Sequence, residues 1–104
     1  MSVERTRVLV VDDEEIVRES LGGWLTQDGH LVEVAADGPS GLEKLRAGSW
    51  SIVLVDLKMP GMDGLQVLAE ARKLQPAAAV VLLPVYATVE TAVSAIKLGA
   101  YDYL

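Results

Sequence analysis

The sequence has no cysteine, no long apolar run and few basic residues. Without cysteine it forms no disulfide framework and no thiolate nucleophile, which suits the cytoplasm, the location we expect. No apolar stretch approaches the roughly 20 residues that a membrane span requires. The N-terminal MSVERTR lacks the apolar segment of a signal peptide. We therefore expect no contact with a membrane.

Positive charge is scarce: Lys and Arg total 9, Asp and Glu total 15, and the formal net charge is -6. Nucleic-acid-binding domains usually carry a basic face, so we expect no direct nucleic-acid binding by this domain. Hydrophobic residues make up 51% of the chain and charged residues 23%, a composition that supports a folded core. The length of 104 residues fits one domain.

Short segments rich in Val and Leu alternate with segments of helical periodicity. The first kind predicts strands at 7–13, 31–35, 51–56 and 79–84. The second kind, with proline near helix starts and glycine after helix ends, predicts helices at 14–29, 38–48, 63–76 and 88–99. The final YDYL, residues 101–104, predicts the start of a fifth strand.

Strand–helix alternation with short loops predicts a doubly wound α/β fold with a parallel five-stranded sheet. LVEVA (31–35) is the one strand that alternates polar and apolar residues, so we expect it at a sheet edge. The sequence stops within the fifth strand, and we expect the last helix to be absent from this chain. The helical periodicity places Trp24 in the core, and Trp50, just before a strand, is expected to be partly exposed.

Acidic residues close two of the predicted strands. Asp12 and Asp13 close the first strand and Asp56 closes the third, and ligands of open α/β sheets bind beyond these carboxyl ends. Two carboxylates ~4 Å apart repel by about 4 kcal/mol at an effective dielectric constant near 20. A cation relieves this repulsion, and a small set of oxygen ligands favours Mg²⁺. A carboxylate beside Mg²⁺ can attack phosphorus, because the metal neutralises the charge of the phosphoryl group.

A simpler alternative is that the DDEE segment (12–15) only caps a helix and complements its dipole. That alternative does not account for Asp56, which ends an apolar strand and precedes a Pro-Gly turn. The two strand ends together favour a site.

Three segments resemble the receiver domain of bacterial two-component response regulators, most closely the receivers of nitrogen-regulator-class transcription activators. They are VLVVDDEE, IVLVDLKMPGMDG and ATVETAVSAIKLGAYDYL. The resemblance covers essentially the whole chain, 1–104, and implies a flavodoxin-like sheet of strand order 2-1-3-4-5.

The resemblance also implies roles for individual residues. Asp56 matches the phosphoacceptor, to which a sensor histidine kinase would transfer a phosphoryl group. Asp13 matches a direct Mg²⁺ ligand and Asp12 a ligand that acts mostly through water. The backbone carbonyl of Lys58 matches a further ligand. Residues that shape the loop or match the aromatic switch position are Pro60, Gly61, Gly64 and Tyr103.

Two departures from the family pattern concern the switch. Pro84 stands where the family has Ser or Thr, whose hydroxyl binds the phosphoryl group. The family's lysine follows DYL by two residues, beyond Leu104. Hydrogen bonds to charged groups contribute about 1.5–3 kcal/mol each. Driving a two-state switch from 1:99 to 99:1 takes about 5.5 kcal/mol. We therefore expect impaired switching.

The expected function is that of a signalling phosphoacceptor, which is no enzyme beyond its own phosphorylation and dephosphorylation. Its expected partners are a sensor histidine kinase, the output domain of a longer parent protein and a second copy in a homodimer. An alternative is a pseudo-receiver, an interaction module that is never phosphorylated. A Mg²⁺-dependent phosphohydrolase is disfavoured, because VDLKMPG has no second Asp two residues after Asp56.

Overall fold

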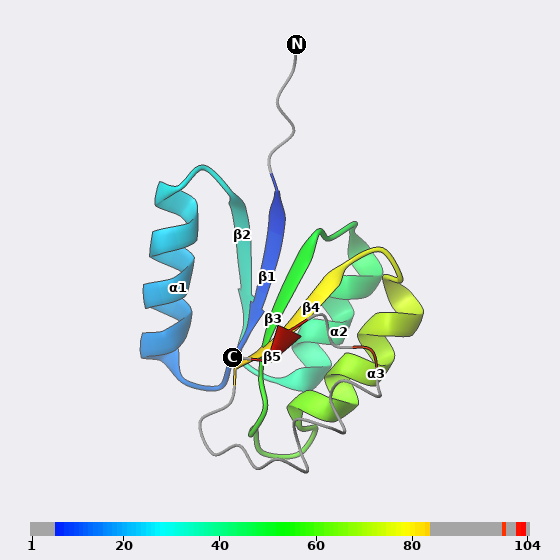
Figure 1. Ribbon diagram of the computed structural model, residues 1–104. Coiled ribbons are helices and arrows are strands. Elements are labelled where there is room, and N and C mark those ends of the chain that lie inside the picture. Colours follow the sequence, from blue (N-terminus) through cyan, green and yellow to red (C-terminus); the bar gives the residue numbers. More distant parts are fainter. Residues whose placement is uncertain (1–5, 84–98, 100–101, 104) are drawn as a thin grey trace.

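A computed structural model describes residues 6–83, 99 and 102–103 of the chain. Its centre is a parallel five-stranded sheet of order β2-β1-β3-β4-β5 (Figure 1). The predicted strand order is therefore confirmed, with LVEVA as the edge strand β2. The strands are β1 (Arg7–Val11), β2 (Leu31–Ala35), β3 (Ile52–Asp56), β4 (Ala79–Leu83) and β5 (Asp102–Tyr103).

Helices cover the two faces of this sheet. One face carries α1 (Glu15–Gln27), and the other carries α2 (Gly38–Ala47) and α3 (Gly64–Leu74) (Figure 1). These three helices are confirmed, with ends within two residues of the predicted ones. The predicted fourth helix at 88–99 lies outside the described residues except at Gly99, and Pro84 lies outside them as well.

Local sequence signals explain where α2 and α3 begin. The Asp37 carboxylate caps α2 by accepting from the Ser40 backbone N–H at 2.8 Å. A capping box starts α3: Asp63 accepts from the Gln66 N–H at 3.0 Å, and the Gln66 side chain accepts from the Asp63 N–H at 2.9 Å. Both caps fix helices that pack on the same face of the sheet.

The main core lies between the sheet and the pair α2–α3. Side chains from three strands meet two helices there: Leu9, Val11, Val53, Val55, Val80, Leu82, Leu45, Val67, Leu68 and Ala71. The central strands are buried on both faces, because Val8 and Val10 point to the α1 side and are also inaccessible to solvent. This pattern explains the nearly continuous apolar sequences of these strands.

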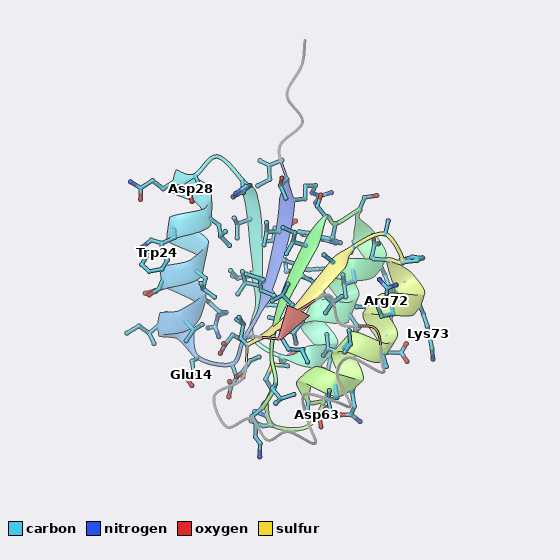
Figure 2. All side chains as sticks on the ribbon, viewed as in Figure 1. Glu14, Trp24, Asp28, Asp63, Arg72 and Lys73 are labelled. Atoms are coloured by element: carbon cyan, nitrogen blue, oxygen red, sulfur yellow. The ribbon has the colours of Figure 1, made fainter. Side chains whose placement is uncertain are left out.

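Both expectations about tryptophan were wrong. Trp24 is 70% exposed and lies on the outer side of α1 (Figure 2). The side of α1 that faces the sheet is formed by half-buried residues such as Val17, Leu21 and Leu25, and Trp24 is not among them. Trp50 is only 6% exposed, and its indole Nε1 donates to the Lys44 carbonyl at 2.9 Å. Because the indole N–H has a hydrogen-bond acceptor, Trp50 can be buried without an unpaired polar group.

No helix in the described part of the chain is long and apolar enough to cross a membrane.

Candidate functional site

Three acidic side chains converge at the carboxyl end of the sheet. One carboxylate oxygen each from Asp12, Asp13 and Asp56 lies within 4.8 Å of the others. The convergence follows from topology, since β1 and β3 are neighbours and Val11 pairs with Val55. Asp56 is the last residue of β3, as predicted. The expected strand end at Asp13 was wrong: β1 ends at Val11, and the two acids lie in the loop that follows.

Two of these acids are buried and one is exposed. Asp12 and Asp56 are 3% and 2% exposed, whereas Asp13 is open to solvent. Each buried carboxylate accepts a hydrogen bond from the backbone N–H two residues later. Asp12 Oδ1 accepts from Glu14 at 2.9 Å, and Asp56 Oδ1 accepts from Lys58 at 3.2 Å. The two carboxylates are thus fixed in matching ways by the loops after β1 and β3.

Burial disfavours charge on these acids. It raises the pKa of Asp56 to about 6, against the opposing effect of the Lys58 N–H, and the neighbouring Asp12 and Asp13 raise this pKa further. Burial also raises the pKa of Asp12, again with repulsion from Asp13. An all-oxygen cluster in which like charges crowd together fits a hard divalent cation such as Mg²⁺.

Two glycines allow the loop after β3 to reach the site. Gly61 has a φ of 76°, a left-handed conformation that favours glycine. A Cβ at Gly64 would overlap the carbonyl oxygen of Asp56 and would lie 2.7 Å from the Leu57 Cα. The Gly64 N–H also donates to the Leu57 carbonyl at 3.0 Å. The start of α3 is therefore packed directly against the end of β3.

Helix capping accounts for only part of the acidic segment. The Asp12 carboxylate does accept from the Glu14 N–H. Glu14 is the N-cap of α1, and its side chain makes no capping hydrogen bond within the described residues. Asp56 stands at a strand end distant in sequence from α1, so the capping alternative does not explain why it joins the cluster.

The other predicted site residues lie around or outside this cluster. The side chains of Lys58 and Pro60 are exposed, which leaves the backbone of Lys58 as its relevant part. Tyr103 lies in β5, where it pairs with Leu82. Pro84, the predicted switch position, falls outside the described residues.

One residue near the site was missed by sequence reasoning. The guanidinium of Arg18, in α1, donates from Nη1 to the Asp12 backbone carbonyl at 2.8 Å. A cation one helical turn into a helix that follows an acidic loop is the signal that could have indicated this contact.

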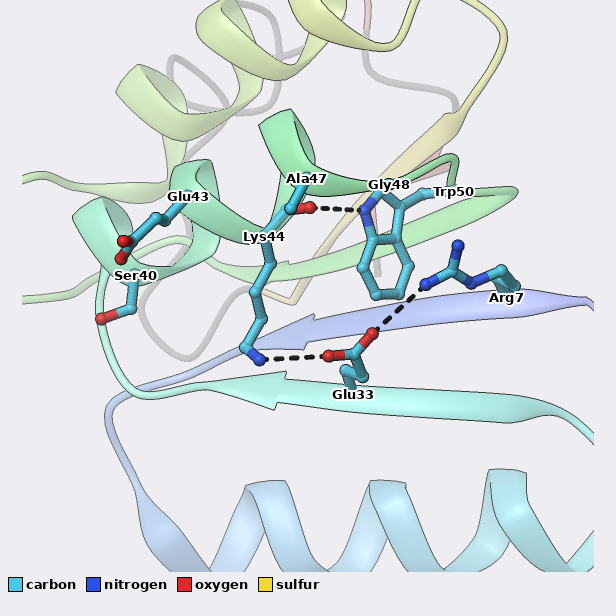
Figure 3. Close-up of a pocket in the computed structure, with 8 residues that line it drawn as sticks. All are labelled: Arg7, Glu33, Ser40, Glu43, Lys44, Ala47, Gly48 and Trp50. Carbon is cyan, nitrogen blue, oxygen red and sulfur yellow. Dashed lines mark hydrogen bonds and ion pairs between the residues drawn. The ribbon is translucent and has the colours of Figure 1, made fainter.

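A separate groove lies between α2 and the edge of the sheet (Figure 3). Three of its four charged side chains form ion pairs: Glu33 contacts Arg7 at 3.3 Å and Lys44 at 3.2 Å, and Glu43 is the fourth. The Arg7 guanidinium also lies 4.5 Å from the Trp50 ring centroid. These ion pairs link β1, β2 and α2, and we therefore interpret the groove as a structural feature.

Comparison with known proteins gives a consistent result. Residues 8–104 match the family model described as the response regulator receiver domain. The transcriptional regulatory protein ZraR of Klebsiella oxytoca, one of several nitrogen-regulator-class activators among the relatives, is 40% identical over 108 residues. The alignment covers 100% of this chain and 24% of ZraR, so the chain spans about a quarter of that relative.

Two solved structures show the same fold. A CheY-like response regulator receiver domain from Methanospirillum hungatei JF-1 matches with a TM-score of 0.94 at 33% identity, covering 97% of this chain and 81% of that one. A response regulator from Burkholderia pseudomallei, containing a phosphorylated aspartic acid, a calcium ion and citrate, matches with a TM-score of 0.92 at 34% identity. That alignment covers 95% of this chain and 58% of the other.

Proposed function

Because this chain belongs to the family of response regulator receiver domains, we propose that Asp56 accepts a phosphoryl group from a sensor histidine kinase. The convergence of the Asp12, Asp13 and Asp56 carboxylates within 4.8 Å carries this proposal. Asp56 is the member that ends a core strand, with its backbone fixed by α3 through Gly64. A fixed carboxylate at the bottom of an acidic site is well placed to attack.

Asp13, Asp12, Asp56 and the Lys58 carbonyl would hold a Mg²⁺ ion. When bound, the ion would neutralise the charge of the cluster and of the incoming phosphoryl group. An Asp56 carboxylate oxygen forms the new bond to phosphorus as the bond between phosphorus and the donor breaks. The Burkholderia relative, which holds both a phosphorylated aspartic acid and a calcium ion, supports this arrangement by similarity.

The biological setting is part of the same proposal. Residues 1–104 form the receiver domain of a longer cytoplasmic transcription regulator, and phosphorylation controls its output domain, as the similarity to ZraR suggests. The receiver passes on a signal and turns over no external substrate. Its acidic composition fits a role in which DNA contacts are left to the output domain, and homodimerisation is one route to that control.

Phosphorylation by a small acyl phosphate tests the proposal without the kinase. Incubation with acetyl phosphate and Mg²⁺ should add one phosphoryl group, detected by mass spectrometry of the intact protein. Asp56→Asn should abolish the gain, and so should removal of Mg²⁺ by a chelator. Asp28→Asn, an exposed acid at the other end of α1, is the matched control and should be phosphorylated normally.

A poorly coupled switch is a further part of the proposal, supported by Pro84 in the sequence. Proline offers no hydroxyl to the phosphoryl group, and a hydrogen bond to a charged group contributes about 1.5–3 kcal/mol. Titration with beryllofluoride and Mg²⁺, followed by NMR, should give small chemical-shift changes over 84–104. Pro84→Thr should enlarge them. Changes that are already large with Pro84 present would contradict impaired coupling.

The pseudo-receiver alternative is favoured by the same proline. It predicts that the wild-type chain gains no phosphoryl group at any Mg²⁺ concentration, while the fold and its family membership stand unchanged. The mass measurement therefore separates the two functions directly.

A further inference from the structure

Arg18 binds the backbone of the loop that carries two of the three acids. It lies in the second turn of α1, is half-buried, and donates from Nη1 to the Asp12 carbonyl oxygen at 2.8 Å. The Asp12 N–H donates to the Ala35 carbonyl at 3.1 Å, and Asp12 Oδ1 accepts from the Glu14 N–H at 2.9 Å. Asp12 is thus fixed at three polar groups by three different parts of the fold.

The bond from Arg18 matters because α1 otherwise packs on the sheet only through half-buried side chains. None of the 13 residues of α1, all within the described part of the chain, is buried. Its N-cap residue Glu14 makes no side-chain capping bond to the described residues. A hydrogen bond from a charged donor is among the stronger polar contacts in proteins. The Arg18–Asp12 bond therefore links the position of α1 to the position of the acidic loop.

We propose that Arg18 is a positioning residue for the metal site: it fixes the Asp12 backbone so that the Asp12 carboxylate stays within the cluster. The proposal rests on the function proposed above, because it assigns Arg18 a part in Mg²⁺ binding. Arg18 contacts neither the metal nor the phosphoryl group in this role. Mutation of a group that orients a metal ligand commonly weakens metal binding by about 10–100-fold.

Arg18 also acts on the site through its charge. The guanidinium favours the ionised form of Asp12 and so opposes the effect of burial on the pKa of that carboxyl. The same charge repels Mg²⁺, but the guanidinium is only half-buried, so solvent and salt screen part of this repulsion. A ligand that is not held in place must be ordered whenever the metal binds. We therefore expect the positioning effect to exceed the repulsion at physiological ionic strength.

The first test needs no metal and no phosphoryl donor. Amide hydrogen exchange is measured in metal-free wild type and in Arg18→Met, which keeps a long, helix-favouring side chain but removes the donor and the charge. Exchange of the Glu14 N–H, the donor to Asp12 Oδ1, should accelerate about tenfold by local opening. The Lys58 N–H, the equivalent donor to Asp56 Oδ1, is the internal control and should change less than about twofold.

Two further variants separate geometry from charge. Arg18→Lys keeps the charge and a donor, and should restore slow exchange at Glu14 in large part. Arg46→Met removes the same charge from an exposed position of α2 that has no hydrogen bond or ion pair among the described residues. It should leave the exchange of Glu14 unchanged. Equal exchange at Glu14 in wild type and Arg18→Met would overturn the proposal, and so would an equal acceleration of Lys58.

The second test measures Mg²⁺ binding by NMR titration at 0.15 M ionic strength. The dissociation constant should rise about tenfold in Arg18→Met, rise less in Arg18→Lys and stay unchanged in Arg46→Met. Tighter binding by Arg18→Met would mean that repulsion dominates and would overturn the proposal. If wild type binds no Mg²⁺, the proposed function fails, together with the metal role of Arg18. The exchange data would then still decide whether Arg18 positions Asp12.

Discussion

The two faces of the sheet are packed to very different degrees. On the face covered by α2 and α3, Leu45, Leu68 and Ala71 are completely buried. On the other face, α1 contributes no buried residue, and its side chains Ile16 and Trp24 are each 70% exposed. The free energy that holds the described fold together therefore comes mainly from the α2–α3 face.

The acidic site joins these two halves. Asp56 belongs to the well-packed half, because the start of α3 contacts its backbone at Gly64. Asp12 lies in the loop that joins β1 to the less buried helix α1, and three hydrogen bonds hold it there, including the one from Arg18. The proposed nucleophile is thus positioned by helix packing, whereas the proposed metal ligand Asp12 is positioned by hydrogen bonds and Asp13 is open to solvent.

The largest expected difference between the two faces is in the cost of a cavity. Leu68→Ala, on α3, should lower the free energy of unfolding by about 3 kcal/mol, because it removes a fully buried side chain. Leu21→Ala, the matched change on half-buried α1, should cost about 1 kcal/mol. Urea denaturation followed by circular dichroism measures both. Equal costs would show that α1 is packed as tightly as α3.

The next largest expected effect is on the pH dependence of the free energy of unfolding, and it comes from the burial of Asp56. The pKa of Asp56 is raised from 3.8 to about 6 in the folded protein. Between these values the folded state holds a proton that the unfolded state has lost, so the free energy of unfolding of the metal-free protein should fall as pH rises from 4 to 6. The shift corresponds to a loss of up to about 3 kcal/mol, complete above pH 6.

Asp56→Asn should remove most of this loss. The variant should be more stable than metal-free wild type by about 2 kcal/mol at pH 7.5 and about equal to it at pH 4. Burial also raises the pKa of Asp12, so the free energy of unfolding of the variant should still fall with rising pH, but by less. Added Mg²⁺ should stabilise wild type through binding to the folded state and have little effect on Asp56→Asn. Thermal unfolding across this pH range, with and without Mg²⁺, checks each part.

The well-packed half of the molecule was the more predictable from sequence. The apolar strands and the helix periodicity reflect local patterns, whereas the strand order was predicted from the resemblance to receiver domains. Asp37 and Asp63 are N-cap residues that the sequence analysis did not single out. Asp56 could be found from a local pattern, since it directly follows a continuous apolar strand. The convergence of the three acids followed from adjacent strands that end at the same edge of the sheet.

The loosely packed half was less predictable. Periodicity identifies the side of a helix that is apolar, but it does not reveal what covers that side, and so Trp24 was wrongly placed in the core. The contact between Arg18 and the Asp12 carbonyl was missed because backbone acceptors are invisible in a sequence pattern. The wrong expectation for Trp50 has a similar cause: its buried position depends on Lys44, whose carbonyl accepts from the indole.

The two tryptophans give the smallest and most selective comparison of the two faces. Trp50→Phe removes the donor to the Lys44 carbonyl and shrinks a ring that the Arg7 guanidinium covers, so it should cost about 1–2 kcal/mol. Trp24→Phe changes an exposed ring and should lie within about 0.5 kcal/mol of wild type. Urea denaturation measures both costs.

Fluorescence gives an independent measurement of the same difference. Acrylamide should quench the emission of Trp50→Phe, which retains Trp24, far more strongly than that of Trp24→Phe, which retains the buried Trp50. Equal quenching of the two variants would mean that the α1 side is covered in solution. A large loss of unfolding free energy in Trp24→Phe would point to the same conclusion. In that event α1 would be held to the sheet by packing as well as by the Arg18 bond. A faster exchange of the Glu14 N–H than of the Lys58 N–H in Arg18→Met would then report the loss of the Arg18 bond alone.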